Sequence, residues 1–227
     1  MKSLLVLRPE PGACETVARA QAIGLDVSHC PLFTIQQVKW DVPEPDHYFG
    51  LLLTSANAVR FGGTGLAALR FMPVFAVGEA TATAAREAGF ESVVAGDGDV
   101  ARLLARIATL GPQRLLHLAG EDFRSVDVSG IEIDRRTVYS AHALPLPDPL
   151  PSLLAQSPVV MVHSPRAAAR FAALCDEAQV DRSTIALAAI SDQAARAAGD
   201  GWEALAIAAK PRDEALIEIA EALCNAG

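Results

Sequence analysis

Two short polar stretches stand at matching places in the chain, about 110 residues apart. The apolar run GLLL ends in TSAN at residues 54–57, and the run VVMV ends in HSPR at residues 163–166. Apolar residues resume at helical spacing after each stretch, so small polar residues occupy a predicted junction between a strand and a helix. Such residues cap helices, and their small size lets an anion reach the N–H groups at the positive end of the helix dipole. The stretches are candidate carboxylate or phosphate sites, and helix capping alone is the alternative.

Short apolar runs that end in turn residues recur along the whole chain, and most are followed by an Ala-rich helical pattern. The pattern predicts parallel strands buried on both faces, with the helices as crossovers between them. It is typical of a doubly wound α/β fold. The successive segments are LLVLRPEPG and ETVARAQAIG, GLLLTSAN and AVRFGGTGLAAL, VFAVGEA and TATAAREAG, LLHLAGEDF, VVMVHSPR and AAARFAALCDEA, and IALAAISDQ and AARAAGDGW.

The second half of the chain repeats features of the first. Two similar half-chains predict two similar domains, and turns repeated in both could line one cleft. The repeat leaves open whether each domain is one contiguous half or whether the first strand and helix pack with the last part of the chain. The matching segments are 4–9 with 115–120, TSAN with HSPR, 77–89 with 190–202, and the extended stretches 33–38 and 137–143, each followed by a proline-rich spacer.

Composition limits the partners and the compartment. The formal charge is −8 and no Lys/Arg cluster is present, which argues against nucleic acid as a partner. No stretch approaches the roughly 18 apolar residues of a membrane span, and the first residues lack the pattern of a signal peptide. The four cysteines are scattered and form no CxxC pair, which favours reduced thiols. We therefore expect a cytoplasmic protein with neither a nucleic-acid nor a membrane partner.

Motifs for several other chemistries are missing. The Gly-rich stretches FGGTG at 61–65 and GDGD at 96–99 match neither a dinucleotide fingerprint nor a phosphate-binding P-loop. The five histidines show no metal-ligand spacing, so no metal site is expected. No GxSxG pattern surrounds Ser55 or Ser164, which argues against a hydrolase nucleophile.

The motifs TSANAV, AVGEATA and VHSPRAA, with Tyr139 between the second and the third, resemble the uroporphyrinogen-III synthase family in their order and spacing. The resemblance runs from LLVLRP near the start to AAKP at 208–211. It implies two similar flavodoxin/Rossmann-like domains joined by a two-stranded β-ladder, with the first strand and helix packed onto the C-terminal half. The implied domains are 1–33 with 144–227, and 39–136, with linker strands at 34–38 and 137–143.

The resemblance also implies a reaction. Enzymes of this family close the linear tetrapyrrole hydroxymethylbilane with loss of water and inversion of the last pyrrole ring, giving uroporphyrinogen III in tetrapyrrole (haem) biosynthesis. No metal or organic cofactor is implied. The substrate carries eight carboxylates on a flexible chain, and orienting it is worth roughly 7–11 kcal/mol in well-aligned intramolecular reactions. We further expect a monomer and a transient hand-over of substrate from hydroxymethylbilane synthase.

Individual site residues follow from the matching motifs. Tyr139 would be the catalytic residue, because a phenol is protonated at neutral pH and can donate to the departing hydroxyl. A second group would bind the substrate carboxylates through hydroxyl, amide, guanidinium or backbone N–H groups. This group comprises Arg8, Thr54, Ser55, Asn57, Gly78, Thr81, Ser164, Arg166, Ser191 and Gln193.

One segment departs from the family pattern. Where the family often has Gly-x-Thr-Thr-Ala, the chain reads SDQAA from Ser191. Either Asp192 caps its helix and points away from the ligand, or substrate contacts depend on backbone N–H groups and Gln193. The departure favours an alternative function, a non-catalytic cytosolic two-domain binding module or sensor for a small polyanion. Tyr139 and the lack of a fused regulatory segment favour the enzyme.

Overall fold

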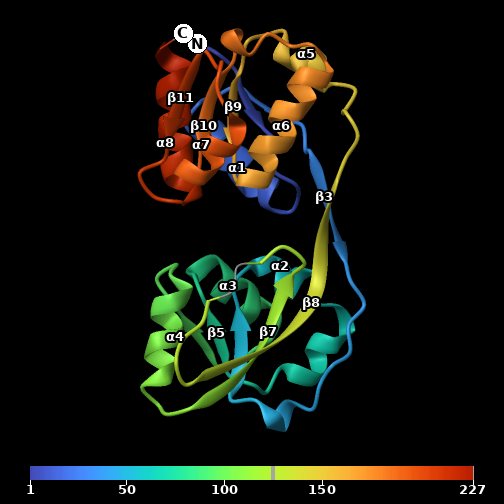
Figure 1. The fold of residues 1–227 in the computed structure, drawn as a ribbon, viewed down its shortest axis with the longest axis vertical. Coiled ribbons are helices and arrows are strands. Elements are labelled where there is room, and N and C mark those ends of the chain that lie inside the picture. Colours follow the sequence, from blue (N-terminus) through green and yellow to red (C-terminus); the bar gives the residue numbers. More distant parts are fainter. Residues whose placement is uncertain (124–125, 227) are drawn as a thin grey trace. The chain divides into compact units, whose positions relative to one another are not determined.

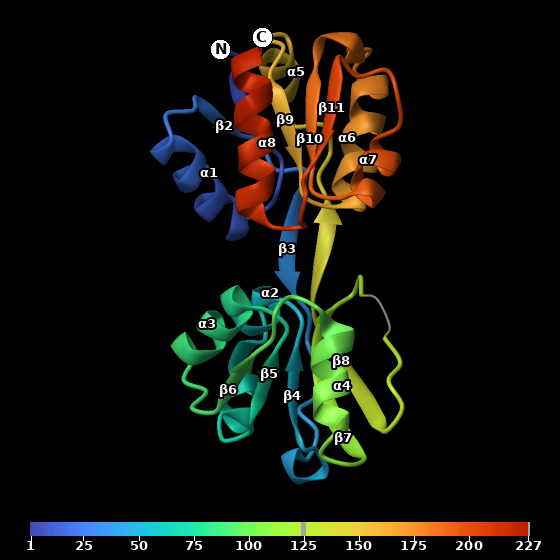
Figure 2. The same cartoon turned by 90° about the vertical axis from the view of Figure 1, so that its left-hand side faces the viewer.

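The computed structural model describes residues 1–123 and 126–226, and the chain divides into two compact units. Unit 1 is Met1–Thr34 together with His142–Gly227, and unit 2 is Ile35–Ala141. Each unit contains a mainly parallel sheet with helices on both of its faces (Figures 1 and 2). The predicted fold class, two doubly wound α/β domains joined by two strands, is confirmed.

Five strands form the sheet of unit 1: β1 (Leu4–Val6), β2 (Val27–His29), β9 (Val159–Val162), β10 (Ala186–Ala189) and β11 (Ala204–Ile207). Their order is β11-β10-β9-β1-β2, and every neighbouring pair is parallel. Numbered along the chain within the unit, the order reads 2-1-3-4-5, as in flavodoxin-like folds. Such sheets bind ligands beyond the carboxyl ends of their strands, where the strand order reverses.

Two layers of helices cover this sheet (Figure 1). Strands β1, β9 and β10 are buried at every residue, because alternate side chains point to opposite helical layers. Leu4 and Val6 of β1 pack in one apolar cluster with residues of the helices α1 and α8. The layers comprise α1 (Gly12–Ala22) and α8 (Asp213–Ala226) on one face, and α6 (Pro165–Glu177) and α7 (Asp192–Ala198) on the other, with the short helices α5 (Leu150–Leu154) and η3 (Arg182–Thr184) beside them.

The sheet of unit 2 has six strands: β3 (Phe33–Gln37), β4 (Gly50–Leu53), β5 (Val74–Ala76), β6 (Val93–Ala95), β7 (Gln113–Gly120) and β8 (Ile131–Ala143). The order is β3-β8-β7-β4-β5-β6. Leu51 and Leu53 of β4 pack in the cluster that α2, η2 and α3 cover, whereas Leu52 packs with α4 on the opposite face. The remaining bounds are η1 (Pro45–His47), α2 (Ala56–Arg60), η2 (Gly63–Leu69), α3 (Glu79–Glu87) and α4 (Val100–Ala108).

The two sheets share one spatial arrangement. The order β2-β1-β9-β10-β11 in unit 1 corresponds to β8-β7-β4-β5-β6 in unit 2, which is the structural counterpart of the sequence repeat. Strand β3 lies beside β8. The division between the units falls inside both of these strands, so β3 and β8 are the two connections of the ladder.

Two details differ from the sequence expectation. The helix expected after TSAN is split, because α2 ends at Arg60 and a 3₁₀ helix begins at Gly63, where φ is +66°. Glycine tolerates this left-handed conformation at little steric cost. The three strands that were not expected, β2, β6 and β11, are all sheet edges with partly exposed residues. Strand β2 (VSH) contains two polar residues, whereas β6 (VVA) and β11 (ALAI) are short apolar runs like those of the expected strands.

Candidate functional site

Four strand-to-helix turns in the molecule have one backbone geometry. Ser55 follows β4, Gly78 lies between β5 and α3, Ser164 follows β9 and Ser191 lies between β10 and α7. Their φ values are −150°, −144°, −161° and −164°, and their ψ values are 140°, 166°, 156° and 161°. Strand β4 neighbours β5, and β9 neighbours β10. Each unit therefore presents two equivalent turns side by side at the carboxyl ends of its strands.

The three serines of these turns cap the helices that follow. Ser55 Oγ accepts a hydrogen bond from the N–H of Asn57 at 3.2 Å, and Ser164 Oγ accepts from Ala167 at 3.1 Å. Ser191 Oγ accepts from the N–H of Ala194 at 3.3 Å. Capping uses an acceptor position of the hydroxyl and leaves its O–H able to donate to a carboxylate. Helix capping and ligand binding are therefore compatible roles for the same side chain.

Gly78 differs from the other described glycines. A Cβ added there would meet no atom within 4 Å, and its φ of −144° suits any residue. Each of the other glycines in residues 1–123 and 126–226 has a positive φ or would place a Cβ within 3.0 Å of a neighbouring atom. Neither backbone conformation nor the packing of the described residues requires glycine at position 78. Gly78 is the N-cap of α3, a position where glycine is favoured, and its missing side chain also lets a ligand approach the backbone.

Two threonines accompany the turns of unit 2. Thr54 Oγ1 is hydrogen-bonded to Nε2 of the buried His117 at 3.1 Å. Burial, with a further contribution from the charge of Arg135, lowers the pKa of His117 to about 4, so this imidazole is neutral at pH 7. Thr81 lies in the first turn of α3, and its side chain is buried. Its N–H donates to the carbonyl of Gly78 at 3.1 Å, so Thr81 supports this turn from the inside.

Tyr139 lies on β8, where the pairing of β7 and β8 is irregular. Ala119 pairs with Thr137, but the next residue, Gly120, pairs with Tyr139. Such an irregularity re-aims a side chain. A Cβ at Gly120 would lie 2.7 Å from two ring carbons of Tyr139, so glycine lets the ring lie against the end of β7. The ring centroid is also 6.3 Å from that of Phe61.

In unit 1, Arg8 belongs to a polar network centred on Asp213. Arg8 Nη1 donates to Thr16 Oγ1 at 3.0 Å and to Asp213 Oδ1 at 3.4 Å. Asp213 also accepts from Thr16 Oγ1 at 2.9 Å, His163 Nε2 at 2.9 Å and Arg19 Nη1 at 2.9 Å. Burial alone would raise the pKa of Asp213, but the hydrogen bonds and positive charges lower it to about 2. The ionised carboxylate therefore fixes Arg8 beside the ends of β1 and β9.

The other predicted residues of unit 1 lie at the start of α6 and α7. The guanidinium of Arg166 stacks on the ring of Phe33 at 4.9 Å. Gln193 is exposed in the first turn of α7. Ser191, and not Asp192, caps this helix, so the expectation that Asp192 could be the cap is wrong. Asp192 is exposed at the first helical position, where the helix dipole favours a negative charge.

The predicted set therefore forms one group in each unit. Neither group could be completed from sequence, because only folding brings Thr16 and Asp213 to Arg8 and His117 to Thr54. His163 joins the first of these groups through Asp213. His163 alone carried a signal, since it belongs to the HSPR stretch. Unit 2 holds Thr54, Ser55, Asn57, Gly78, Thr81 and Tyr139, and unit 1 holds Arg8, Ser164, Arg166, Ser191 and Gln193.

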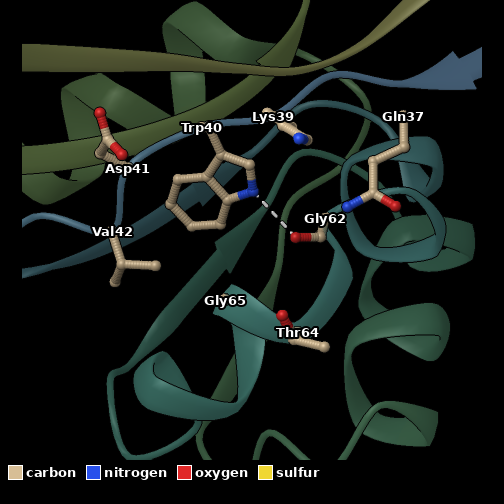
Figure 3. A pocket seen from close by; sticks show the side chains of 8 residues that line it. All are labelled: Gln37, Lys39, Trp40, Asp41, Val42, Gly62, Thr64 and Gly65. Atoms are coloured by element: carbon tan, nitrogen blue, oxygen red, sulfur yellow. Dashed lines mark hydrogen bonds between the residues drawn. The ribbon is translucent and has the colours of Figure 1, made fainter.

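Unit 2 has a cavity of about 580 Å³, and no residue of the predicted set lines it. It lies between the segment after β3 and helix η2, and Trp40 Nε1 donates there to the carbonyl of Gly62 at 2.9 Å (Figure 3). A Cβ at Gly65 would lie 2.9 Å from the indole of Trp40, and one at Gly63 would lie 2.1 Å from Gln37 Nε2. The glycines of FGGTG therefore allow close packing of this segment.

The part of the chain that the structure describes contains no cluster of three or more His, Cys, Asp or Glu side chains arranged to hold a metal ion. Within the same residues, no helix is both long enough and apolar enough to cross a membrane.

Comparison with known proteins gives a consistent result. A family model described as Uroporphyrinogen-III synthase HemD matches residues 15–218. The chain is similar in structure to uroporphyrinogen-III synthetase from Helicobacter pylori, with 18% identity and a TM-score of 0.64 over 98% of this chain and 100% of that one. It is also similar to a mutant uroporphyrinogen III synthase from Thermus thermophilus, with 18% identity and a TM-score of 0.50 over 97% of this chain and 98% of that one. No curated protein matches the chain.

The structural matches have low sequence identity and establish the fold, whereas the family model covers most of the sequence. The motif order, the paired turns of both units and the family match lead to one conclusion. The chain belongs to the uroporphyrinogen-III synthase family, and it is a cyclising lyase of tetrapyrrole biosynthesis.

Proposed function

We propose that the chain converts hydroxymethylbilane to uroporphyrinogen III with the strand-end turns of both units as carboxylate-binding groups and Tyr139 as the proton donor. The observation that carries this proposal is the repeated turn geometry together with Gly78, whose lack of a side chain leaves the backbone of its turn open to a ligand. An octacarboxylate on a flexible chain needs many anchoring points. Hydroxyl and backbone N–H donors supply them without a strongly basic pocket, in keeping with the formal charge of −8.

The proposed binding groups differ in how they act. The hydroxyls of Ser55, Ser164 and Ser191 donate to carboxylates while their second role as helix caps holds them in place. Gly78 exposes backbone N–H groups to close approach. The remaining members are Arg8, Thr54, Asn57, Thr81, Arg166 and Gln193, with Thr81 acting through its turn because its side chain is buried.

Tyr139 is proposed to protonate the hydroxyl that leaves as water. Its ring is held between the end of β7 and Phe61, which limits the positions that the phenolic O–H can take. The leaving group needs a proton because hydroxide is a poor leaving group at neutral pH. General acid catalysis of this kind contributes about 10²–10⁴-fold to a rate. The other part of the acceleration comes from holding the last pyrrole ring for closure at its substituted carbon.

A coupled assay tests the proposal. Hydroxymethylbilane is generated in situ, the protein is added, and the oxidised porphyrins are separated into type I and type III isomers by chromatography. We expect type III from the wild-type protein. In Tyr139→Phe, we expect type III formation to fall by about 10²–10⁴-fold, with spontaneous type I product in its place. The folded state should keep its stability, because phenylalanine retains the ring contacts.

The two parts of the proposal fail separately. Type I alone from the wild-type protein would contradict the enzymatic function and leave the binding-module alternative. Type III formation at the wild-type rate in Tyr139→Phe would contradict only the role of Tyr139. Ser55→Ala and Ser164→Ala test one turn in each unit, and each should raise KM.

Several further assignments belong to the same proposal. The two domains are taken as residues 1–33 with 144–227, and 39–136, with linker strands at 34–38 and 137–143. The chain is proposed to act as a cytoplasmic monomer that receives substrate transiently from hydroxymethylbilane synthase. Limited proteolysis checks the domain boundaries, and sedimentation in the analytical ultracentrifuge checks the oligomeric state.

A further inference from the structure

A second cavity of unit 2, of about 230 Å³, lies where α4 covers β7 and β8, and it reaches Thr54 at the end of β4. Most of its lining is apolar, but two basic side chains, His117 and Arg135, lie in it as well. Since one water molecule occupies about 30 Å³ of liquid, the cavity has room for a small organic group. Its lining consists of Leu52, Thr54, Val100, Leu104, His117, Phe123, Val126, Asp127, Ile133 and Arg135.

The strand register places the two basic residues side by side. His117 of β7 is directly opposite both Leu52 of β4 and Arg135 of β8. Two residues earlier, Leu115 is opposite Ile133, so the same face of the sheet is apolar there and packs on α4. The polar pair therefore begins where the apolar contact with α4 ends, level with the last residues of β4.

The guanidinium group of Arg135 lacks a hydrogen-bond acceptor for one of its nitrogens in this arrangement. Its Nη1 atom is buried and has no hydrogen-bond partner among residues 1–123 and 126–226. Its Cζ atom lies 3.6 Å from the ring centroid of Phe123, which is itself 47% exposed although it is a large apolar side chain. A buried N–H of a charged group without an acceptor is costly, and an anion in the cavity would remove this cost.

We propose that this cavity binds one carboxylate group carried on a short hydrocarbon stem. Arg135 donates from Nη1 to the carboxylate, and Phe123, Val100 and Leu104 pack against the stem. The carboxylate is either an arm of the tetrapyrrole substrate or a free small acid. Binding of a substrate arm rests on the function proposed above, because Thr54 belongs to the proposed substrate-binding group and also lines this cavity.

The charges around the cavity provide an internal control. Asp127 also lines it and is exposed, so a negative charge at the rim repels the proposed ligand. Replacing Arg135 and replacing Asp127 should therefore change affinity in opposite directions. Arg106, an exposed arginine of α4 outside the lining, is a matched control for loss of a positive charge.

The first experiment titrates propionate into the isotope-labelled full chain and follows backbone amide shifts by NMR. Propionamide, which has the same shape and no charge, is the comparison ligand. We expect Arg135→Leu to weaken propionate binding at least about tenfold, because a charge-assisted hydrogen bond is lost. We expect Asp127→Asn to tighten it about threefold, because a nearby like charge is removed. Arg106→Leu should bind propionate as the wild-type protein does.

The results decide the proposal without requiring turnover. Equal propionate affinity in the wild-type protein, Arg135→Leu and Asp127→Asn would overturn it, as would equal binding of propionate and propionamide. Thermal unfolding and circular dichroism identify any variant that fails to fold. If Arg135→Leu misfolds, the exposed Asp127→Asn still decides the outcome, since unchanged affinity there contradicts an anion site.

The coupled assay then separates the two sources of the carboxylate. A raised KM for hydroxymethylbilane in Arg135→Leu, with kcat little changed, supports the cavity as a site for a substrate arm. An unchanged KM, with propionate binding lost, supports a site for a free small acid. Failure of the wild-type protein to form type III product would contradict the proposed function and leave the propionate result standing on its own.

Discussion

Acidification should destabilise unit 2 through His117. This imidazole is 5% exposed, and burial together with the charge of Arg135 lowers its pKa from 6.5 to about 4. In the unfolded chain the imidazole is hydrated and binds a proton near the ordinary value. Between pH 6.5 and pH 4 the unfolded state therefore binds more protons than the folded state, and stability falls as the pH is lowered.

The size of the effect follows from the two pKa values. At pH 5, the protonated imidazole outnumbers the neutral form by about 30 to one in the unfolded chain, but it is only about one-tenth of the total in the folded unit. This difference corresponds to about 2 kcal/mol of stability lost between pH 7 and pH 5. Replacing His117 by glutamine removes the titration and keeps a polar group near Thr54 Oγ1.

The two tryptophans allow the measurement to be confined to one unit. Trp40 lies in unit 2 and Trp202 in unit 1. Phenylalanine at position 202 retains an aromatic ring against Phe171, and emission then reports only the surroundings of Trp40. Urea unfolding in this background at pH 7, 6 and 5 gives the free energy of unfolding of unit 2 at each pH.

We expect the background protein to lose about 2 kcal/mol more than His117→Gln between pH 7 and pH 5. His47→Gln is the control, because His47 is exposed in the same unit and its imidazole is hydrated in both states. An equal loss in the background protein and in His117→Gln would refute the reasoning. A flat profile in both would refute it as well, since the buried imidazole would then carry no linkage.

Three other predictions concern single residues. Gly78→Ala should change the free energy of unfolding by less than about 0.5 kcal/mol, because the added Cβ has space, and urea unfolding measures this change. The same variant should raise KM about tenfold in the coupled assay, because the Cβ stands where the ligand is proposed to approach the backbone. Gly120→Ala should lower kcat at least about tenfold because its Cβ displaces the ring of Tyr139, and a normal rate of type III formation would count against that position of the ring. Asp213→Asn should destabilise unit 1 by about 1–2 kcal/mol at pH 7, measured by the emission of Trp202 in a Trp40→Phe background. This difference should shrink as the pH falls from about 4 towards 2, where the wild-type carboxylate gains its proton.

The sequence predicted the interior strands of both sheets and the edge strand β3, but not the other three edge strands. Strands β1, β4, β5, β7, β9 and β10 are apolar runs because both of their faces are covered, and each was expected. The edge strand β2 (VSH) contains polar residues and lacks that signal, whereas β6 (VVA) and β11 (ALAI) are short apolar runs that the pattern did not single out. The junction after Arg60 was also missed, because the left-handed backbone at Gly63 is set by the chain that packs against it.

The candidate site shows the same limit. Helix-capping residues at strand ends can be recognised from local sequence, and Ser55, Ser164 and Ser191 are N-caps. The partners of Arg8 and Thr54 depend on tertiary structure: Asp213 is 205 residues from Arg8, and His117 is 63 residues from Thr54. The pairing of His117 with Arg135 required the register of β7 and β8, which no local pattern specifies.

The split of unit 1 around unit 2 sets an order for folding on the ribosome. Strand β1 pairs with β9, so the central strand pair of unit 1 cannot form until residues beyond 158 have left the exit tunnel. More than 100 residues are synthesised between β2 and β9, and their synthesis takes on the order of 10 s at ordinary elongation rates. All strands of unit 2 emerge during the same interval. Unit 2 can therefore complete its sheet while β1, α1 and β2 still lack β9 and α8, and a chaperone or a protease would meet the first 34 residues without these packing partners.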